Sequence, residues 1–241
     1  MSARCLAVIA GSGMGPLADV LATRAVTPFT AIDGVGACGV EGHAGEVREG
    51  TVDGRPCLLV LGRRHGYEGA LPAVARLMAF LAGRGATDLL VTSAAGALHT
   101  TLFPGDLVVA HDLIDRQNRR PGAENARPRL DRNLTAAVEY AAMAAGIAVH
   151  RGTLVCCAGP AYETVAEVGA LQAAGDVATM SGAPEVAAAG ACGIRVAAVA
   201  MVTNPCTGIA SAVPSHEEVL RVGRGASGGL AALMRQLVIK L

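Results

Sequence analysis

The sequence predicts an α/β protein with one domain that spans residues 1–241. Patterns typical of buried strands alternate with amphipathic helix patterns along the whole chain, as in proteins built from a central sheet and covering helices. The stretch 58–98 reads as strand, polar loop, helix and second strand, which is the pattern of one βαβ unit. Apolar residues make up 52% of the 241 residues and no linker divides them, so one large core is expected.

In the first third of the chain, a buried strand over 5–10 leads into the glycine-rich turn 11–15 and a helical run that ends at Leu21. A turn of this kind before a helix offers backbone N–H groups to an anion. Its spacing is GxGxG, not GxGxxG, so a dinucleotide site is disfavoured although Asp33 stands about twenty residues further on. Residues 34–54 are rich in glycine, and hairpins and loops are expected there.

The remaining elements follow in order. Apolar residues at helical spacing predict a helix over 70–83, which ends at a glycine. Thr164 is expected to open a helix over 165–173, and Ser215 with Glu218 has the capping-box pattern of a final helix. Six arginines lie within 116–132, which favours a surface loop or lid. Further strands are expected at 107–114, 151–159, 177–179 and 195–204, and further helices after Leu134 and after Ser181.

Polar and small residues lie at the two loop ends of the βαβ unit. The first loop carries Arg63, Arg64 and His65, and the second, over 92–96, is small enough for its backbone N–H groups to approach an anion. Both loops should face one crevice, because ligands bind outside the carboxyl ends of parallel strands. A phosphate site fits this cluster. A solvated loop with salt bridges would fit it too.

Composition excludes several classes of function. The formal net charge is zero, so the chain lacks an overall basic surface for nucleic acid. Nothing resembles a membrane span or a secretion signal, so no membrane partner is expected. The seven cysteines have no CxxC spacing. We therefore interpret them as small core residues in a reducing cytoplasm, with no metal site.

Nine short motifs then stand in the order typical of a known family. The chain resembles the purine nucleoside phosphorylases, in the trimeric class of the nucleoside phosphorylase superfamily that also contains methylthioadenosine phosphorylase. The motifs are GSGMG at 11, GHAG at 42, GRRHGYEG at 62, TSAAGAL at 92, PGDL at 104, AGPAYETVAE at 158, MSGAPE at 180, VTNPCTG at 202 and SHEEVL at 215.

The resemblance implies a mixed central β-sheet flanked by helices, the nucleoside phosphorylase fold. It implies phosphate-dependent cleavage of the N-glycosidic bond of a purine nucleoside to free base and ribose 1-phosphate. Inorganic phosphate is then a co-substrate, and no other cofactor is needed. By resemblance, the phosphate-binding residues are Ser12, Arg63, His65, Ala94 through its amide, and Ser181.

The resemblance also assigns the nucleoside side of the site. Ribose is expected against Tyr67 and Met180, with His216 near the 5′-hydroxyl. Glu163 and Asn204 are expected to bind the base and, with His65, to carry catalysis; Tyr162 packs on the purine face. A carboxylate accepts the N1–H of a 6-oxopurine, and an amide accepts from N7–H while it donates to O6. Adenine-specific members tend to have Asp at position 204, so Asn favours inosine and guanosine.

Three alternatives and a few departures accompany this assignment. A methylthioinosine or methylthioadenosine phosphorylase, a non-catalytic purine-binding homologue and a dinucleotide-dependent enzyme are the competing functions. A homotrimer is the expected assembly. Ser93 stands where the family often has Asn, Gly182 replaces a Thr, and Arg64 replaces a bulky or aromatic residue. The loop 115–132 contains no aromatic residue that could enter a neighbouring subunit's pocket.

Overall fold

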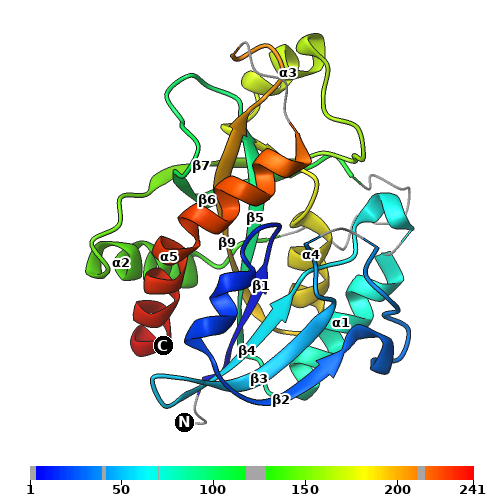
Figure 1. Ribbon diagram of the computed structural model, residues 1–241, viewed down its shortest axis with the longest axis vertical. Coiled ribbons are helices and arrows are strands. Elements are labelled where there is room, and N and C mark those ends of the chain that lie inside the picture. The colour runs from blue at the N-terminus through cyan, green and yellow to red at the C-terminus, as the bar shows by residue number, and fades with distance from the viewer. Residues whose placement is uncertain (1–3, 40–41, 70, 118–128, 211–214) are drawn as a thin grey trace.

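The computed structural model describes residues 4–39, 42–69, 71–117, 129–210 and 215–241. Within these ranges nine strands form one mixed sheet in the order β2-β3-β4-β1-β5-β8-β7-β6-β9, and β9 pairs again with β5. Helices lie on both sides of this sheet (Figure 1). The α/β class, with a mixed central sheet flanked by helices, is therefore confirmed.

One half of the sheet is built on three parallel strands. β1 (Leu6–Ala10) lies between β4 (Arg55–Leu61) and β5 (Asp88–Ala97) and is parallel to both. The antiparallel strands β3 (Glu46–Val52) and β2 (Ala22–Pro28) extend the sheet to its free edge. The βαβ unit predicted over 58–98 thus exists as β4, helix α1 (Leu71–Gly83) and β5, with β1 inserted between its two strands.

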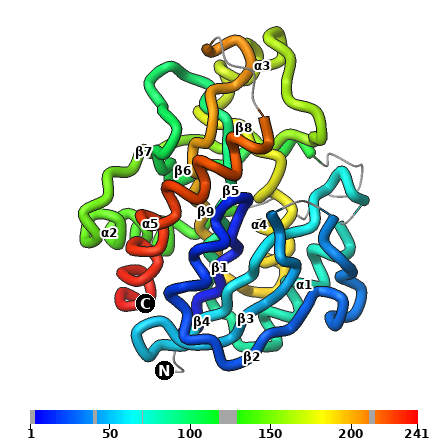
Figure 2. The backbone as a smooth tube through the Cα atoms, viewed as in Figure 1, coloured from blue at the N-terminus to red at the C-terminus, as the bar shows by residue number. Residues whose placement is uncertain are grey.

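The other half of the sheet closes on itself. β5 continues into a ring that also contains β8 (Val177–Thr179), β7 (His150–Cys156), β6 (Leu107–Asp115) and β9 (Arg195–Pro205). β5 and β9 run parallel along almost their whole length, with a register shift between Ala95 and Gly96. In Figure 2 the labels of these five strands lie above those of β1 to β4, which form the other half of the sheet.

The side chains of the strands alternate between two hydrophobic cores, one on each face of the sheet. One face packs on α1 and on α4 (Ala183–Ala191); the opposite face packs on α2 (Arg132–Ala144) and α5 (His216–Lys240). α3 (Val165–Gln172) covers a smaller cluster beside the ring. None of the helices in the described ranges could span a lipid bilayer.

The helical run expected after the turn at 11–15 is present as a short 3-10 helix, Gly15–Val20. Three other local features differ from the expectation. Residues 92–96, expected as a loop, belong to β5 because β9 and β8 supply backbone partners for them. The strand β2 was not predicted, since its side chains are mostly exposed on both faces. Of the seven cysteines, Cys192 is exposed, so not all of them are core residues.

Both predicted helix starts are confirmed, although at Ser215 the structure shows the cap and not the return bond of the predicted capping box. Thr164 caps α3 in a capping box with Glu167, and the Ser215 hydroxyl accepts the N–H of Glu218 at the start of α5. Most of the arginine-rich loop predicted over 116–132 lies outside the described residues.

Candidate active site

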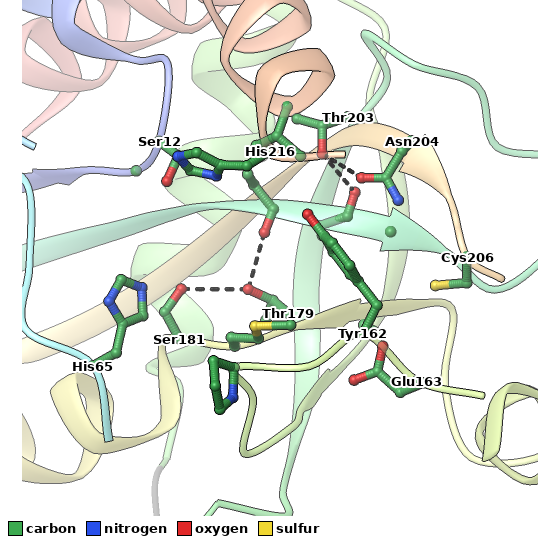
Figure 3. Close-up of a pocket in the computed structure, with 18 of the residues that line it drawn as sticks. Ser12, His65, Tyr162, Glu163, Thr179, Ser181, Thr203, Asn204, Cys206 and His216 are labelled. Atoms are coloured by element: carbon green, nitrogen blue, oxygen red, sulfur yellow. Dashed lines mark hydrogen bonds between the residues drawn. The ribbon is translucent and has the colours of Figure 1, made fainter. Parts of the chain in front are cut away.

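A cavity of about 340 Å³ opens at the carboxyl ends of β1, β4, β5 and β9. It is also lined by the turn before α3, the turn between β8 and α4, and the first residue of α5. All of the predicted site residues line this cavity: Ser12, Arg63, His65, Tyr67, Ala94, Tyr162, Glu163, Met180, Ser181, Asn204 and His216. Figure 3 shows Ser12, His65 and Ser181 at one end and Glu163 and Asn204 at the other.

Arg63 is a buried cation in the wall of the cavity. Its side chain is 2% exposed, although it lies in the loop directly after β4. One terminal nitrogen, Nη2, donates to the carbonyl of Thr92, and Nη1 lies 3.2 Å from the carboxylate of Glu185. Nε has no hydrogen-bond partner among the described residues, and the contact of Nη1 with Glu185 is an ion pair without hydrogen-bond geometry. A buried donor without a partner is costly, so the Nε–H group indicates a missing acceptor.

Two stacked histidines stand beside this guanidinium. His43 stacks on His65 with ring centroids 5.6 Å apart, and His65 stacks on Tyr67 at 4.9 Å. His43 Nε2 is hydrogen-bonded to the Ser12 hydroxyl at 3.1 Å. Burial, and next the charge of Arg63, lower the pKa of each histidine to about 4. Both rings are therefore neutral at pH 7 and can accept as well as donate a hydrogen bond.

His43 was not assigned a role from the sequence. It stands in the GHAG motif at 42. A histidine among otherwise small residues was the sequence feature that could have indicated a role for it. His43 can lie at the cavity because Gly62 has no side chain. A Cβ on residue 62 would lie only 2.6 Å from the His43 Cβ. The histidine thus packs directly on the strand end that presents Arg63.

The turn between β8 and α4 supplies hydroxyl groups. Thr179 donates to the carbonyl of Ala94 at 3.0 Å and is hydrogen-bonded to Ser181 at 3.3 Å. Gly182 has a φ of 104°, a conformation that glycine adopts readily. Its N–H donates to the Glu185 carboxylate at 3.0 Å, which completes the start of α4. The Ser181 side chain is thereby fixed against the end of β5.

The opposite end of the cavity holds an amide and a carboxylate. Asn204 is 4% exposed; its Oδ1 accepts from the Thr203 hydroxyl and its Nδ2 donates to the Pro205 carbonyl, each at 2.9 Å. One N–H and one lone pair of the amide remain for a ligand. Cys206 lies between Asn204 and Glu163 in Figure 3. Burial raises the pKa of its thiol to about 12, so the thiol stays protonated.

Two residues discussed from the sequence are not part of the cavity wall. Arg64 donates to the carbonyl of Val35 at 2.9 Å and faces Glu68 at 3.7 Å. Asp33 does not line the cavity. Because the GSGMG turn is followed by a 3-10 helix and an antiparallel strand, the chain has no βαβ dinucleotide unit there.

This geometry agrees with what comparisons of the whole chain find. Residues 6–239 match the family model described as the phosphorylase superfamily. The chain is 32% identical to purine nucleoside phosphorylase 1 of Bacillus subtilis (strain 168), over 97% of this chain and 91% of that protein. The chain belongs to the purine nucleoside phosphorylase family. Members of this family are pentosyltransferases, and this chain is an enzyme of that kind.

Solved structures of the family have the same fold. The purine nucleoside phosphorylase of Schistosoma mansoni in complex with inosine superposes with a TM-score of 0.85 at 33% identity, covering 98% of this chain and 90% of that one. The same schistosome enzyme in complex with adenosine gives a TM-score of 0.83 at 34% identity, with the same coverage. The nucleoside phosphorylase fold expected from the motifs is therefore confirmed.

Proposed function

We propose that this enzyme cleaves 6-oxopurine nucleosides, inosine and guanosine, with inorganic phosphate, and releases the free base and ribose 1-phosphate. The observation that carries the proposal is Arg63, a side chain that lines the cavity and whose buried Nε donor lacks a hydrogen-bond partner among the described residues. A phosphate oxygen is the acceptor that a guanidinium fork suits best.

Ser12, Arg63, His65, the Ala94 amide and Ser181 hold phosphate in this proposal. His43 Nδ1 lies 3.3 Å from both the backbone nitrogen and the carbonyl oxygen of Arg63, and its Nε2 is hydrogen-bonded to the Ser12 hydroxyl. In the tautomer with the proton on Nε2, His43 donates to Ser12 and the Ser12 hydroxyl hydrogen is left for phosphate. His65 Nδ1 faces the carboxylate of Glu68 at 3.4 Å, so its Nε2 is an acceptor for a protonated phosphate oxygen.

Catalysis then rests on position and fixed charge. The phosphate dianion attacks the anomeric carbon and at the same time stabilises the positive charge that develops on the sugar ring. Tyr67 and Met180 pack against the ribose, and His216 binds the 5′-hydroxyl. All three line the cavity.

The base lies between Glu163 and Asn204, with Tyr162 against its face. The Asn204 Oδ1 accepts N7–H of the departing base, and its remaining N–H donates to O6. That pattern favours the leaving group over the bound nucleoside. Since the schistosome structures hold both inosine and adenosine, the preference for a 6-oxo group rests on Asn204 in this chain.

The remaining expectations are parts of the same proposal. Phosphate is the only co-substrate, no organic cofactor takes part, and the enzyme works as a homotrimer in the cytoplasm. The support for the trimer is the resemblance to the trimeric class. Sedimentation of the purified protein measures it.

The test is release of free purine from inosine, guanosine, adenosine and 5′-methylthioadenosine, each with and without phosphate. Cleavage of inosine or guanosine only with phosphate is the expected result. Arg63→Met removes a proposed phosphate ligand and should abolish this reaction. Arg64→Met is its control, because Arg64 carries the same charge outside the cavity. Reaction of the adenine compounds alone would refute the base assignment, and 5′-methylthioadenosine as the best substrate would favour the methylthio alternative. Nucleoside binding without any release would favour a non-catalytic homologue.

A further inference from the structure

Glu185 is a buried acidic residue to which the proposed reaction assigns no part. It belongs to the MSGAPE motif, and its side chain is 3% exposed. It occupies the third position of α4 and is not among the residues that line the cavity. A carboxylate in such a place costs several kcal/mol in desolvation unless partners compensate for it.

The two oxygens of Glu185 join two separate parts of the phosphate end. Oε2 accepts the backbone N–H of Gly182 at 3.0 Å, directly after Ser181. Oε1 lies 3.2 Å from Nη1 of Arg63, which comes from the end of β4. Arg63 is held from its other side by the carbonyl of Thr92. One carboxylate therefore fixes the distance between the guanidinium and the turn that carries Ser181.

Capping of a helix does not by itself explain this burial. Glu167 makes the same capping box at the start of α3, where its carboxylate accepts the Thr164 N–H at 2.8 Å. That glutamate lies at an exposed position. The cap of α4 could equally be made at the surface, so the buried charge of Glu185 has to be explained by its second contact, the one with Arg63.

We propose that Glu185 is a positioning residue for phosphate. It holds Arg63 and the Ser181 turn in one fixed relation, so that both meet the same anion. This inference rests on the proposed function, because Arg63 and Ser181 are phosphate ligands only within it.

Glu185→Gln separates positioning from simple charge. The variant keeps an oxygen for the Gly182 N–H but loses the ion pair with Arg63. By Coulomb attraction alone, removal of a negative charge beside an anion site strengthens phosphate binding. If Glu185 positions Arg63, the variant instead binds phosphate at least about tenfold more weakly, or about 1.4 kcal/mol.

The measurement is calorimetric titration of the full chain with inorganic phosphate, together with KM for phosphate and for inosine. We expect Kd and KM for phosphate to rise about tenfold while KM for inosine changes less than about twofold. Asp88→Asn is the control: the buried carboxylate of Asp88 forms an ion pair with the partly exposed Arg195 at the start of β5, at the end of the sheet away from the cavity. It should lower the melting temperature without any change in phosphate binding.

Unchanged or tighter phosphate binding in Glu185→Gln overturns the proposal, as does an equal rise in both KM values. If that variant does not fold, Glu185→Asp replaces it. Its shorter side chain keeps the charge but cannot reach Arg63 and Gly182 together, so the same loss is expected. Calorimetry needs no turnover. A wild-type protein that binds phosphate but releases no purine would refute the proposed function and still leave Glu185 testable; no phosphate binding by the wild type would refute both.

Discussion

Gly96 is the position where one added methyl group tests the location of the base. It lies in β5 opposite Asn204, and it lines the base end of the cavity. A Cβ built on Gly96 lies 2.6 Å from the Cys206 sulfur and 3.4 Å from the Asn204 amide nitrogen. Ordinary contacts begin near 3.5 Å, so Gly96→Ala must displace the sulfur by about 1 Å.

The direction of that displacement decides the effect. On its other side Cys206 packs in the small cluster with Leu98, Cys157 and Ala178. The sulfur therefore either compresses this cluster or enters the base end of the cavity. Overpacking of this kind costs about 1–3 kcal/mol of unfolding free energy. For a chain of this size each kcal/mol corresponds to about 2–4 °C in Tm.

Phosphorolysis of inosine by Gly96→Ala should fall about 10–100-fold in kcat/KM, equivalent to about 1.4–2.8 kcal/mol. KM for phosphate should stay within about twofold, because Ser12, His65 and Ser181 lie at the other end of the cavity (Figure 3). The double variant Gly96→Ala with Cys206→Ala removes the displaced sulfur and should recover most of the activity. A folded Gly96→Ala with unchanged kcat/KM for inosine would show that the base does not lie between Glu163 and Asn204.

Three further changes test other parts of the site. Asn204→Asp puts a carboxylate oxygen where Nδ2 now donates to the Pro205 carbonyl. In this variant kcat/KM for inosine should fall at least about 100-fold, and the ratio of adenosine to inosine cleavage should rise. An unchanged ratio would contradict the assignment of Asn204 to the base. Since the pKa of His43 and of His65 is about 4 when folded and about 6.5 when unfolded, unfolding free energy should drop as the pH falls from about 6.5 to about 4, by about 1.4 kcal/mol per pH unit for each ring. Phosphate should reduce this loss in melting curves at pH 5, whereas a flat Tm between pH 7 and 5 would refute the neutral histidines. His216→Ala should raise KM for inosine about tenfold but leave 5′-methylthioadenosine cleavage unchanged; an equal effect on both would remove His216 from the 5′ end.

The sequence predicted the cavity better than it predicted the sheet. Site residues stand directly after strands whose apolar runs are easy to recognise, and the carboxyl ends of parallel strands meet at one edge. Strand order is not encoded in such runs: β1 lies between β4 and β5, although the chain places those two strands around a single helix. β2 lacked any signal because exposed side chains on both faces leave no alternation of polar and apolar residues.

Other misses have local causes. Residues 92–96 are so small that they resemble a loop, yet they pair with β9 across a register shift between Ala95 and Gly96. Glu185 fits the pattern of an ordinary capping glutamate, and only the fold shows that Arg63 lies beside it. His43 depends in the same way on contacts between distant segments, here with Ser12 and Gly62.

The order of the sheet also explains how the residues of the proposed phosphate site come together. β1 pairs with β4 so that Ala10 lies beside Leu61, and with β5 so that Ile9 lies beside Val91. The residues that follow these registered positions in the three parallel strands therefore lie at the same edge of the sheet. The Ser12 turn, Arg63 and the carbonyl of Thr92 meet there. Thr92 ties them directly: its hydroxyl accepts the Gly11 N–H, and its carbonyl accepts from Arg63. The proposed phosphate site thus depends on the central place of β1, because the turn that carries Ser12 continues directly from that strand.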